Sequence, residues 1–322
     1  MQLESLYALI ADDMKAVDAV IRRRLRSDVV LINRVAEYIV AAGGKRMRPA
    51  LVILAAGASG YAGEHRHELA AVVEFIHTAT LLHDDVVDES DLRRGRETAN
   101  ALFGNAASVL VGDFLYSRAF QMMVTVGNPR IMEVLSDATN VIAEGEVLQL
   151  MNCHDPEVDV EEYLRVIRYK TAKLFEAAAR LGGILGEVAP ETEAGLARYG
   201  MHLGTAFQLI DDVLDYSGNE GETGKHVGDD LAEGKPTLPL IHVMRHGRPE
   251  QVAMVRRAIE QGGLEELPAI MEAIRETGAL DEARRRAQLE VGNAIAAIAM
   301  LPPTQYRDSL IELADFAVAR RH

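Results

Sequence analysis

Two acidic clusters with the same pattern stand far apart in the sequence. Each is an Asp-Asp-x-x-Asp run behind an apolar stretch, and together they contain Asp84, Asp85, Asp88, Asp211, Asp212 and Asp215. On a helix, the first and last aspartates of a run lie four residues apart and share a face. Like charges so placed destabilise a helix by about 0.2–0.5 kcal/mol per pair. One such run is often only a solvated acidic face, but two, each behind Thr-Ala-x-x-Leu-x, indicate a divalent-cation site.

The ligand type indicates which cation this would be. Carboxylate oxygens suit a hard ion, and Mg²⁺ takes one or two carboxylates, keeps waters and completes its shell with substrate phosphate oxygens. Two carboxylate clusters facing each other would therefore hold a diphosphate between them through several Mg²⁺ ions. All six aspartates are candidate catalytic and metal-binding residues.

Basic residues are in the minority, so their local clusters are informative. The chain has 34 Lys and Arg against 49 Asp and Glu, with a formal net charge of −15. Cations gather in the turn before Pro49, directly after the first acidic run, and around Lys170 and the long irregular stretch 218–236. Each cation taken singly is more often a surface residue. As a set they predict pockets for phosphate groups.

Length and composition exclude several classes of protein. A chain of 322 residues with 48% hydrophobic residues can bury a sizeable core. The single cysteine, Cys153, excludes a disulfide framework, and the acidic charge argues against a nucleic-acid partner. No apolar run suggests a transmembrane segment. The first residues lack a signal-peptide pattern, so a cytoplasmic location is expected.

Apolar residues recur at the helical period along most of the chain. The pattern predicts helices over about 28–42, 50–59, 64–89, 105–126, 130–151, 160–183, 192–217, 237–246, 250–262, 265–277, 280–299 and 304–320. Alternating strand patterns with hairpin turns are absent, and no Pro/Gly/Ser-rich linker interrupts the chain. We therefore predict an all-α fold and a single domain over residues 1–322, with 218–236 as a functional loop.

Seven motifs together resemble the trans-isoprenyl diphosphate synthases, and most of all their long-chain, octaprenyl-type members. They are G-G-K-x-x-R-P at 43–49, F-I-H-T-A-T-L-L-H-D-D-V-V-D at 75–88, R-R-G at 93–95, Y-K-T-A at 169–172, Q-L-I-D-D-V-L-D at 208–215, G-K-x-x-G-x-D-L at 224–231 and G-K-x-T-L-P at 234–239. The region after residue 240 has no usable motif.

The resemblance implies a bundle of antiparallel helices around a deep central cavity, the isoprenoid synthase fold, and a homodimer. The implied enzyme is an Mg²⁺-dependent prenyltransferase. It would extend an allylic diphosphate, such as farnesyl diphosphate, by repeated head-to-tail condensation with isopentenyl diphosphate. The expected product is a long all-trans chain, octaprenyl diphosphate, for a quinone side chain.

The same resemblance implies roles for individual residues. Isopentenyl diphosphate would be bound by Gly44, Lys45, Arg48, His77 and Arg94. The allylic diphosphate would be bound by Arg93, Lys170, Thr171, Gln208, Lys225 and Lys235. Chain length would depend on Ala79, Thr80 and Met123. The family pattern points to Ala79 as the position that limits the growing chain, whereas helix geometry places Thr80 closer to the face of Asp84.

Three other functions compete with this interpretation. A short-chain farnesyl or geranylgeranyl diphosphate synthase would use the same chemistry, and only its product differs. A terpene cyclase needs no basic pocket for isopentenyl diphosphate. A regulatory subunit of a heteromeric synthase is the non-enzyme alternative; it should have lost motif residues, and none is missing here.

Overall fold

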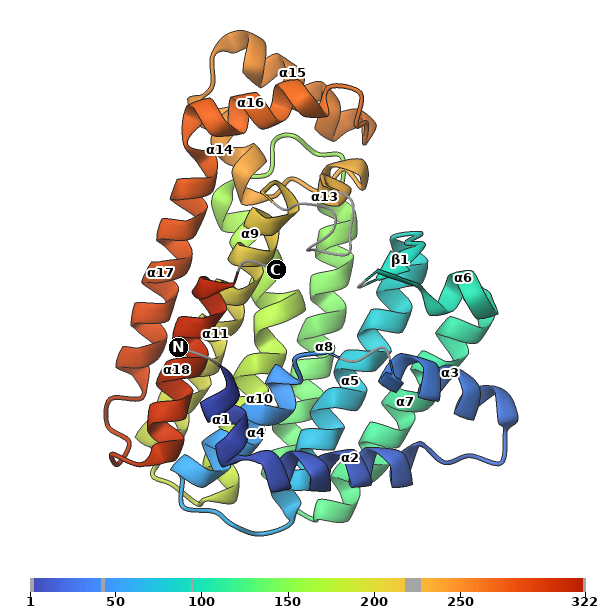
Figure 1. Cartoon of the computed structure of the whole chain (residues 1–322), viewed down its shortest axis with the longest axis vertical. Coiled ribbons are helices and arrows are strands. Elements are labelled where there is room, and N and C mark those ends of the chain that lie inside the picture. The colour runs from blue at the N-terminus through green and yellow to red at the C-terminus, as the bar shows by residue number, and fades with distance from the viewer. Residues whose placement is uncertain (1–2, 42–43, 94, 218–226, 321–322) are drawn as a thin grey trace. The chain divides into compact units, whose positions relative to one another are not determined.

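The computed structural model describes residues 3–41, 44–93, 95–217 and 227–320, and these are almost entirely helical (Figure 1). The all-α prediction is confirmed. The chain forms two compact units: one comprises Met1–Thr139, Leu174–Gly200 and Ile295–Leu313, and the other comprises Asn140–Lys173, Met201–Ala294 and Ala314–His322. A single domain over 1–322 stays a prediction.

The first unit contains most of the N-terminal elements. They are α1 (Leu3–Leu9), α2 (Ala11–Leu25), α3 (Val30–Ala41), α4 (Met47–Ala58), α5 (His65–Val87), β1 (Leu92–Arg93), β2 (Arg96–Glu97), α6 (Ala99–Phe103) and α7 (Asn105–Val126). Five later helices have residues in both units. They are α8 (Pro129–Asn152), α10 (Lys173–Leu185), α11 (Pro190–Asp215), α17 (Ala279–Ala297) and α18 (Gln305–Ala319).

Helix α5 lies at the centre of the first unit. It packs along α7 and also contacts α4 and α2 (Figure 1). Its apolar side chains Leu69, Val72, Val73 and Ile76 are fully buried. Burying one such side chain stabilises a fold by about 1.5–3 kcal/mol. This core fixes the helix whose last turn holds the first acidic motif.

The second unit is built around two buried apolar clusters. Its remaining elements are α9 (Val160–Ile167), η1 (Arg168–Ala172), α13 (Asp229–Ala232), α14 (Leu238–His246), α15 (Pro249–Gln261) and α16 (Leu267–Thr277). One cluster joins α9, α11, α14 and α17, and it contains Leu209, Ile210 and Val213 of α11. The other joins α14, α15 and α16. The first cluster therefore holds the turn of α11 that leads into the second acidic motif.

The structure differs from the sequence-based expectations in several elements, among them the helices α1, α2 and α6, for which no helix was expected. The segment between the helices expected over 64–89 and 105–126, for which no strand was expected, contains a short hairpin, in which Leu92 pairs with Glu97 and Arg93 with Arg96. Strands of two residues are too short to show an alternating pattern. The helix expected over 160–183 is interrupted by η1, a π-helical turn. A short helix, α13, lies within the irregular stretch 218–236, of which 218–226 lie outside the described residues.

Candidate active site

The first acidic motif occupies the C-terminal end of α5. Asp84 and Asp88 are partly exposed there, and Asp88 caps the helix. The next residue, Glu89, has a φ of 50° and turns the chain out of the helix. The C-terminal end of a helix carries a partial negative charge and disfavours acidic side chains. The outer aspartates therefore lie where a cation is attracted both by their own charge and by the helix end.

The middle aspartate of this motif has a different environment. Asp85 is only 3% exposed, and its Oδ1 accepts a hydrogen bond from Nε of Arg93 at 2.7 Å. Burial raises the pKa of Asp85, and the Arg93 guanidinium opposes that rise. Asn100 donates to the backbone oxygen of Asp85 and fixes the turn after the motif. Arg93, predicted to bind the allylic diphosphate, is thus in an ion pair with the motif itself.

The second acidic motif, at the C-terminal end of α11, shows the same contrast between partly exposed outer aspartates and a buried middle one. Asp211 and Asp215 are partly exposed, whereas Asp212 is 2% exposed. Asp212 accepts hydrogen bonds from the Tyr163 hydroxyl at 2.5 Å and from Nε2 of Gln208 at 2.8 Å. Burial raises the pKa of Asp212, and the negative charge of Asp230 raises this pKa further. In both motifs the outer aspartates are the ones accessible from solvent.

The predicted residues Thr171 and Gln208 form a hydrogen-bonded chain to the second motif. The Thr171 hydroxyl donates to Oε1 of Gln208 at 3.0 Å, and Gln208 in turn donates to Asp212. Lys170 precedes Thr171 on η1, and its Nζ lies 2.6 Å from a carboxylate oxygen of Glu146. Short π-helical turns are frequent at functional sites, because the wider turn redirects side chains. The structure therefore joins the predicted residues Thr171, Gln208 and Asp212 in one hydrogen-bonded network.

Gly145 allows α8 to approach this turn closely. A Cβ atom at position 145 would lie 2.6 Å from the backbone nitrogen of Lys170. We expect Gly145→Ala to lower the free energy of unfolding by about 1–3 kcal/mol, since helix and turn must separate. Gly292→Ala is the matched control, because its Cβ would meet nothing within 4 Å among the described residues. The control should raise that free energy by roughly 0.5–1 kcal/mol. Urea denaturation measures both, and equal stability of the two variants would contradict the packing argument.

The basic turn before α4 is braced by neighbouring side chains. Arg46 adopts a left-handed conformation with φ of 47°, and its guanidinium pairs with Glu74 at 2.8 Å. Nη1 of Arg48 lies 3.1 Å from Nε2 of His77, and its guanidinium stacks over the Phe175 ring at 4.4 Å. The predicted residues Arg48 and His77 are thus in contact.

Other predicted binding residues have the following places. Gly44 and Lys45 are exposed, and the Lys45 backbone oxygen accepts a hydrogen bond from the Tyr7 hydroxyl. Lys235 pairs with Glu233. Arg94 and Lys225 lie outside the described residues.

The three candidate chain-length residues differ in exposure. Ala79 and Met123 are buried in α5 and α7, two helices that pack against each other. Thr80 is partly exposed, and its hydroxyl donates to the His77 backbone oxygen at 2.7 Å.

Three residues next to the second motif were not identified from the sequence. Tyr163 and Asp230 adjoin Asp212, and Arg320 pairs with Asp211 at 2.7 Å. Asp230 lies within the G-K-x-x-G-x-D-L motif, so its place in that motif was the available signal. Tyr163 lies outside the quoted motifs, and Arg320 lies in the region without a motif.

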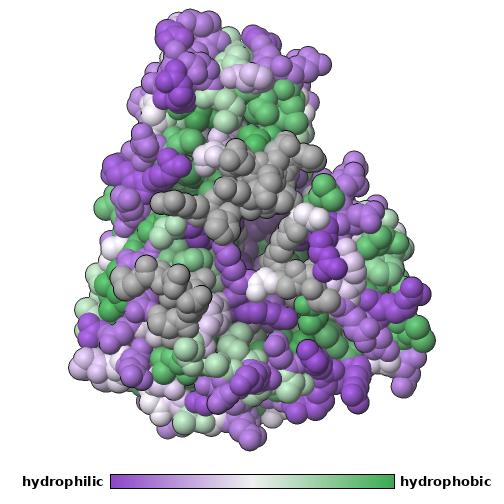
Figure 2. All heavy atoms as spheres, in the orientation of Figure 1, coloured by the Kyte–Doolittle hydropathy of each residue, from purple (hydrophilic) through white to green (hydrophobic). Residues whose placement is uncertain are grey.

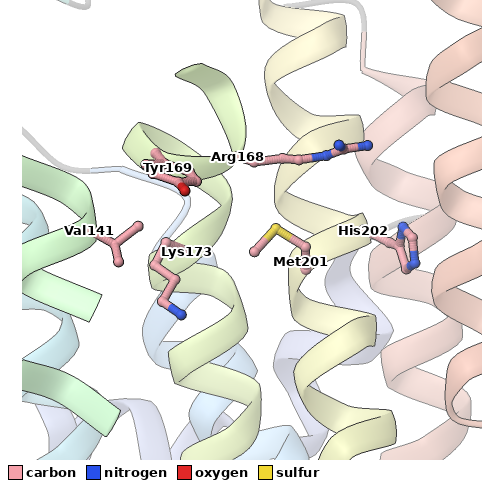
Figure 3. Close-up of a pocket in the computed structure, with 6 residues that line it drawn as sticks. All are labelled: Val141, Arg168, Tyr169, Lys173, Met201 and His202. Carbon is pink, nitrogen blue, oxygen red and sulfur yellow. The ribbon is translucent and has the colours of Figure 1, made fainter. Parts of the chain in front are cut away.

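A pocket of about 420 Å³ lies elsewhere in the second unit (Figure 3). It is lined by Val141, Arg168, Tyr169, Lys173, Met201 and His202. Arg168 and His202 both pair with Glu290, at 3.8 Å and 2.5 Å. None of the predicted site residues lines this pocket, although η1 contributes to both places.

The described residues contain neither a membrane-spanning helix nor a compact cluster of metal-binding side chains. No helix there combines the length and apolar character needed to cross a bilayer. No group of three or more His, Cys, Asp and Glu side chains in that part of the chain is arranged to hold a metal ion. The metal assignment therefore depends on the donor chemistry of the two motifs.

Comparison with known proteins decides the family. A family model described as polyprenyl synthetase matches residues 29–276. The chain belongs to the polyprenyl synthetase family. It is 59% identical over 321 residues to octaprenyl diphosphate synthase of Escherichia coli, covering 99% of each chain. It is 52% identical to octaprenyl diphosphate synthase of Haemophilus influenzae, covering 100% of this chain and 98% of the relative.

A solved structure of this family supports the same assignment. The polyprenyl synthase from Caulobacter crescentus, complexed with calcium and isoprenyl diphosphate, superposes with a TM-score of 0.96 at 46% sequence identity. The match covers 100% of this chain and 98% of that one. The predicted family and the predicted fold class are confirmed.

Proposed function

We propose that this polyprenyl synthetase is an octaprenyl-type trans-prenyltransferase. It extends an allylic diphosphate by repeated condensation with isopentenyl diphosphate. The observation that carries the proposal is the full-length similarity to octaprenyl diphosphate synthases. The regulatory-subunit alternative has no support, because both aspartate motifs are complete. A quinone side chain as the final use of the product, and a cytoplasmic location, stay predictions.

The donor set of the two motifs fits Mg²⁺. Asp84, Asp88, Asp211 and Asp215 offer partly exposed carboxylates at helix C-terminal ends, where a cation relieves unfavourable charge. Asp85 and Asp212 are engaged by Arg93, Tyr163 and Gln208, so we assign them to positioning the motifs. The calcium and isoprenyl diphosphate in the Caulobacter crescentus relative support divalent ions and diphosphate as ligands here too.

The proposed reaction joins two diphosphate substrates head to tail. Bound Mg²⁺ would supply positive charge against the departing allylic diphosphate. The allylic C–O bond breaks, the isopentenyl double bond attacks the allylic carbon, and a proton is lost to the released diphosphate. Holding both substrates in register lowers the entropic barrier. Buried apolar residues such as Val72 and Ile76 would line the path of the chain without offering a nucleophile.

Two groups of side chains would divide the binding task. Lys45, Arg48 and His77, with Gly44 and Arg94, would hold isopentenyl diphosphate. The allylic diphosphate would be held by Arg93, Lys170, Thr171, Gln208, Lys225 and Lys235. Charge-assisted hydrogen bonds from such residues are stronger than neutral ones and suit phosphate oxygens.

We expect this division to appear in steady-state kinetics. Arg48→Ala should raise KM for isopentenyl diphosphate about tenfold or more, with a smaller change for the allylic substrate, since one charged contact is worth about 1.5–3 kcal/mol. Lys170→Ala should do the reverse. Each substrate is varied in turn at saturating levels of the other. Equal changes in both KM values for both variants would argue against two separate sites.

We also propose a homodimer, from an apolar surface on the first unit. Helices α3, α6 and α7 contact one another. Exposed apolar residues on or beside them are Val29, Val30, Leu31, Leu102, Leu110, Phe120 and Val124. Apolar side chains gather over α6 and the start of α3 in Figure 2. Exposed apolar patches of this kind mark interaction surfaces. A monomer in analytical ultracentrifugation would contradict the proposal.

Product analysis tests the proposed function directly. The protein is incubated with farnesyl diphosphate, labelled isopentenyl diphosphate and Mg²⁺, and the dephosphorylated products are separated by reversed-phase chromatography. The expected product is octaprenyl. Accumulation of geranylgeranyl product under excess isopentenyl diphosphate would favour the short-chain alternative, and absence of label in any product would favour the non-enzyme one.

A further inference from the structure

The end of α18 reaches the second aspartate motif within the same compact unit. Nη1 of Arg320 lies 2.7 Å from Oδ1 of Asp211, and its guanidinium stacks over the Phe207 ring at 4.0 Å. Only 9% of the Arg320 side chain is exposed. Phe207 precedes Asp211 by one helical turn, so stacking and ion pairing engage the same face of α11. This arginine belongs to none of the family motifs quoted above.

The charge around Asp211 explains why a cation rests there. The motif aspartates and Asp230 crowd acidic groups at the C-terminal end of α11, where the helix dipole adds further negative charge. Arg320 offsets part of this charge. Its fit is incomplete, however, because neither the buried Nε nor the buried Nη1 of Arg320 makes a well-oriented hydrogen bond among the residues that the structure describes, although Nη1 lies close to Asp211. A buried donor without a partner is unfavourable. The pair is therefore held by charge and stacking, which a dication can outcompete.

We propose that Arg320 is a resident counter-ion of the second aspartate motif, which holds the Asp211 carboxylate while no metal is bound and yields it when a divalent cation binds. This inference rests on the proposed metal role of Asp211. The oxygen that faces Arg320 belongs to the carboxylate assigned to the metal. Arg320 and a bound metal would compete for the charge of the same carboxylate, so in the proposed exchange the apparent metal affinity is reduced by the fraction of protein in which the pair is closed. The end of α18 then responds to occupancy of the metal site.

Binding of Mn²⁺ alone, followed by the electron paramagnetic resonance signal of the free ion, tests the exchange. Arg320→Gln should bind Mn²⁺ roughly two- to fivefold more tightly than the unmodified protein, because the competing charge is gone. Arg320→Lys keeps the charge and should remain close to the unmodified protein. Arg285→Gln is the matched control, since Arg285 pairs with Glu282 on α17. Unchanged or weaker Mn²⁺ binding by Arg320→Gln would overturn the proposal.

Hydrogen exchange gives a readout that a merely structural arginine would not produce. Mn²⁺ should speed amide exchange in residues 314–320 of the unmodified protein, because the pair that holds the end of α18 opens. Equal or slower exchange with Mn²⁺ would also overturn the proposal. The variant Asp211→Asn distinguishes a failure of the proposed metal role of Asp211 from a failure of the proposed exchange with Arg320. Undiminished Mn²⁺ affinity in that variant overturns the metal role of Asp211 and the exchange together. Reduced affinity there, with no gain in Arg320→Gln, overturns the exchange alone.

Discussion

Asp84→Ala and Asp211→Ala should each lower kcat/KM by about 10²–10³-fold or more, because each removes a group that places positive charge against the departing diphosphate. Chelation should abolish turnover, and added Mg²⁺ should restore it. Turnover of radiolabelled isopentenyl diphosphate at saturating Mg²⁺ measures the loss. A near-normal rate in either variant would remove the motifs from the mechanism.

The free energy of unfolding should respond differently when an outer aspartate of the first motif is replaced and when the middle one is replaced. Asp84→Ala relieves repulsion at a helix C-terminal end, so its free energy of unfolding should stay constant or rise by a few tenths of a kcal/mol, on the order of 0.3. Asp85→Ala leaves Arg93 without its buried partner and should cost roughly 1–3 kcal/mol. Asp281→Asn, on a highly exposed aspartate of α17, is the control for both activity and stability. Similar unfolding midpoints for Asp84→Ala and Asp85→Ala would contradict this division of roles.

The helices and both aspartate motifs were predictable from the sequence because they depend on local patterns. Apolar periodicity predicts α5 and α11, and the spacing of Asp84 and Asp88 follows from the helix repeat. The contrast between exposed outer aspartates and buried middle ones was not predictable. It depends on partners far along the chain: Tyr163 lies 49 residues from Asp212, and Arg320 directly follows the last helix.

Short elements escaped prediction for a related reason. The π-helical turn η1 has the composition of an ordinary helix, so its sequence gives no signal, and the close approach of Gly145 to Lys170 exists only in three dimensions. The hairpin that presents Arg93 to Asp85 has strands of two residues, which give no periodic signal. Local sequence rules thus found the motifs, whereas tertiary contacts determine which member of each motif remains accessible.

Product length should change most with substitutions one turn before Asp84. By resemblance to the family, the growing tail passes the small residues Ala79 and Thr80. Helix geometry places Thr80 within about 40° of Asp84, at roughly 100° per residue, and Ala79 further to the side. Ala79 is fully buried and Thr80 partly exposed. With farnesyl diphosphate as the primer, we expect Ala79→Tyr to shorten the product from octaprenyl to about geranylgeranyl length while leaving the first condensation nearly intact.

Burial of Ala79 makes a stability measurement part of this experiment. A tyrosine forced into a filled core costs about 1–3 kcal/mol, whereas one that enters the space of the growing tail costs little and blocks elongation. Ala71→Tyr is the matched control, because Ala71 is also fully buried on α5 but faces about 80° away. It should destabilise the fold without shortening the product. Reversed-phase chromatography under excess isopentenyl diphosphate compares the products. An unshortened product from Ala79→Tyr, with a shortened one from Thr80→Tyr, would assign the chain-length limit to Thr80, on the face that Asp84 shares.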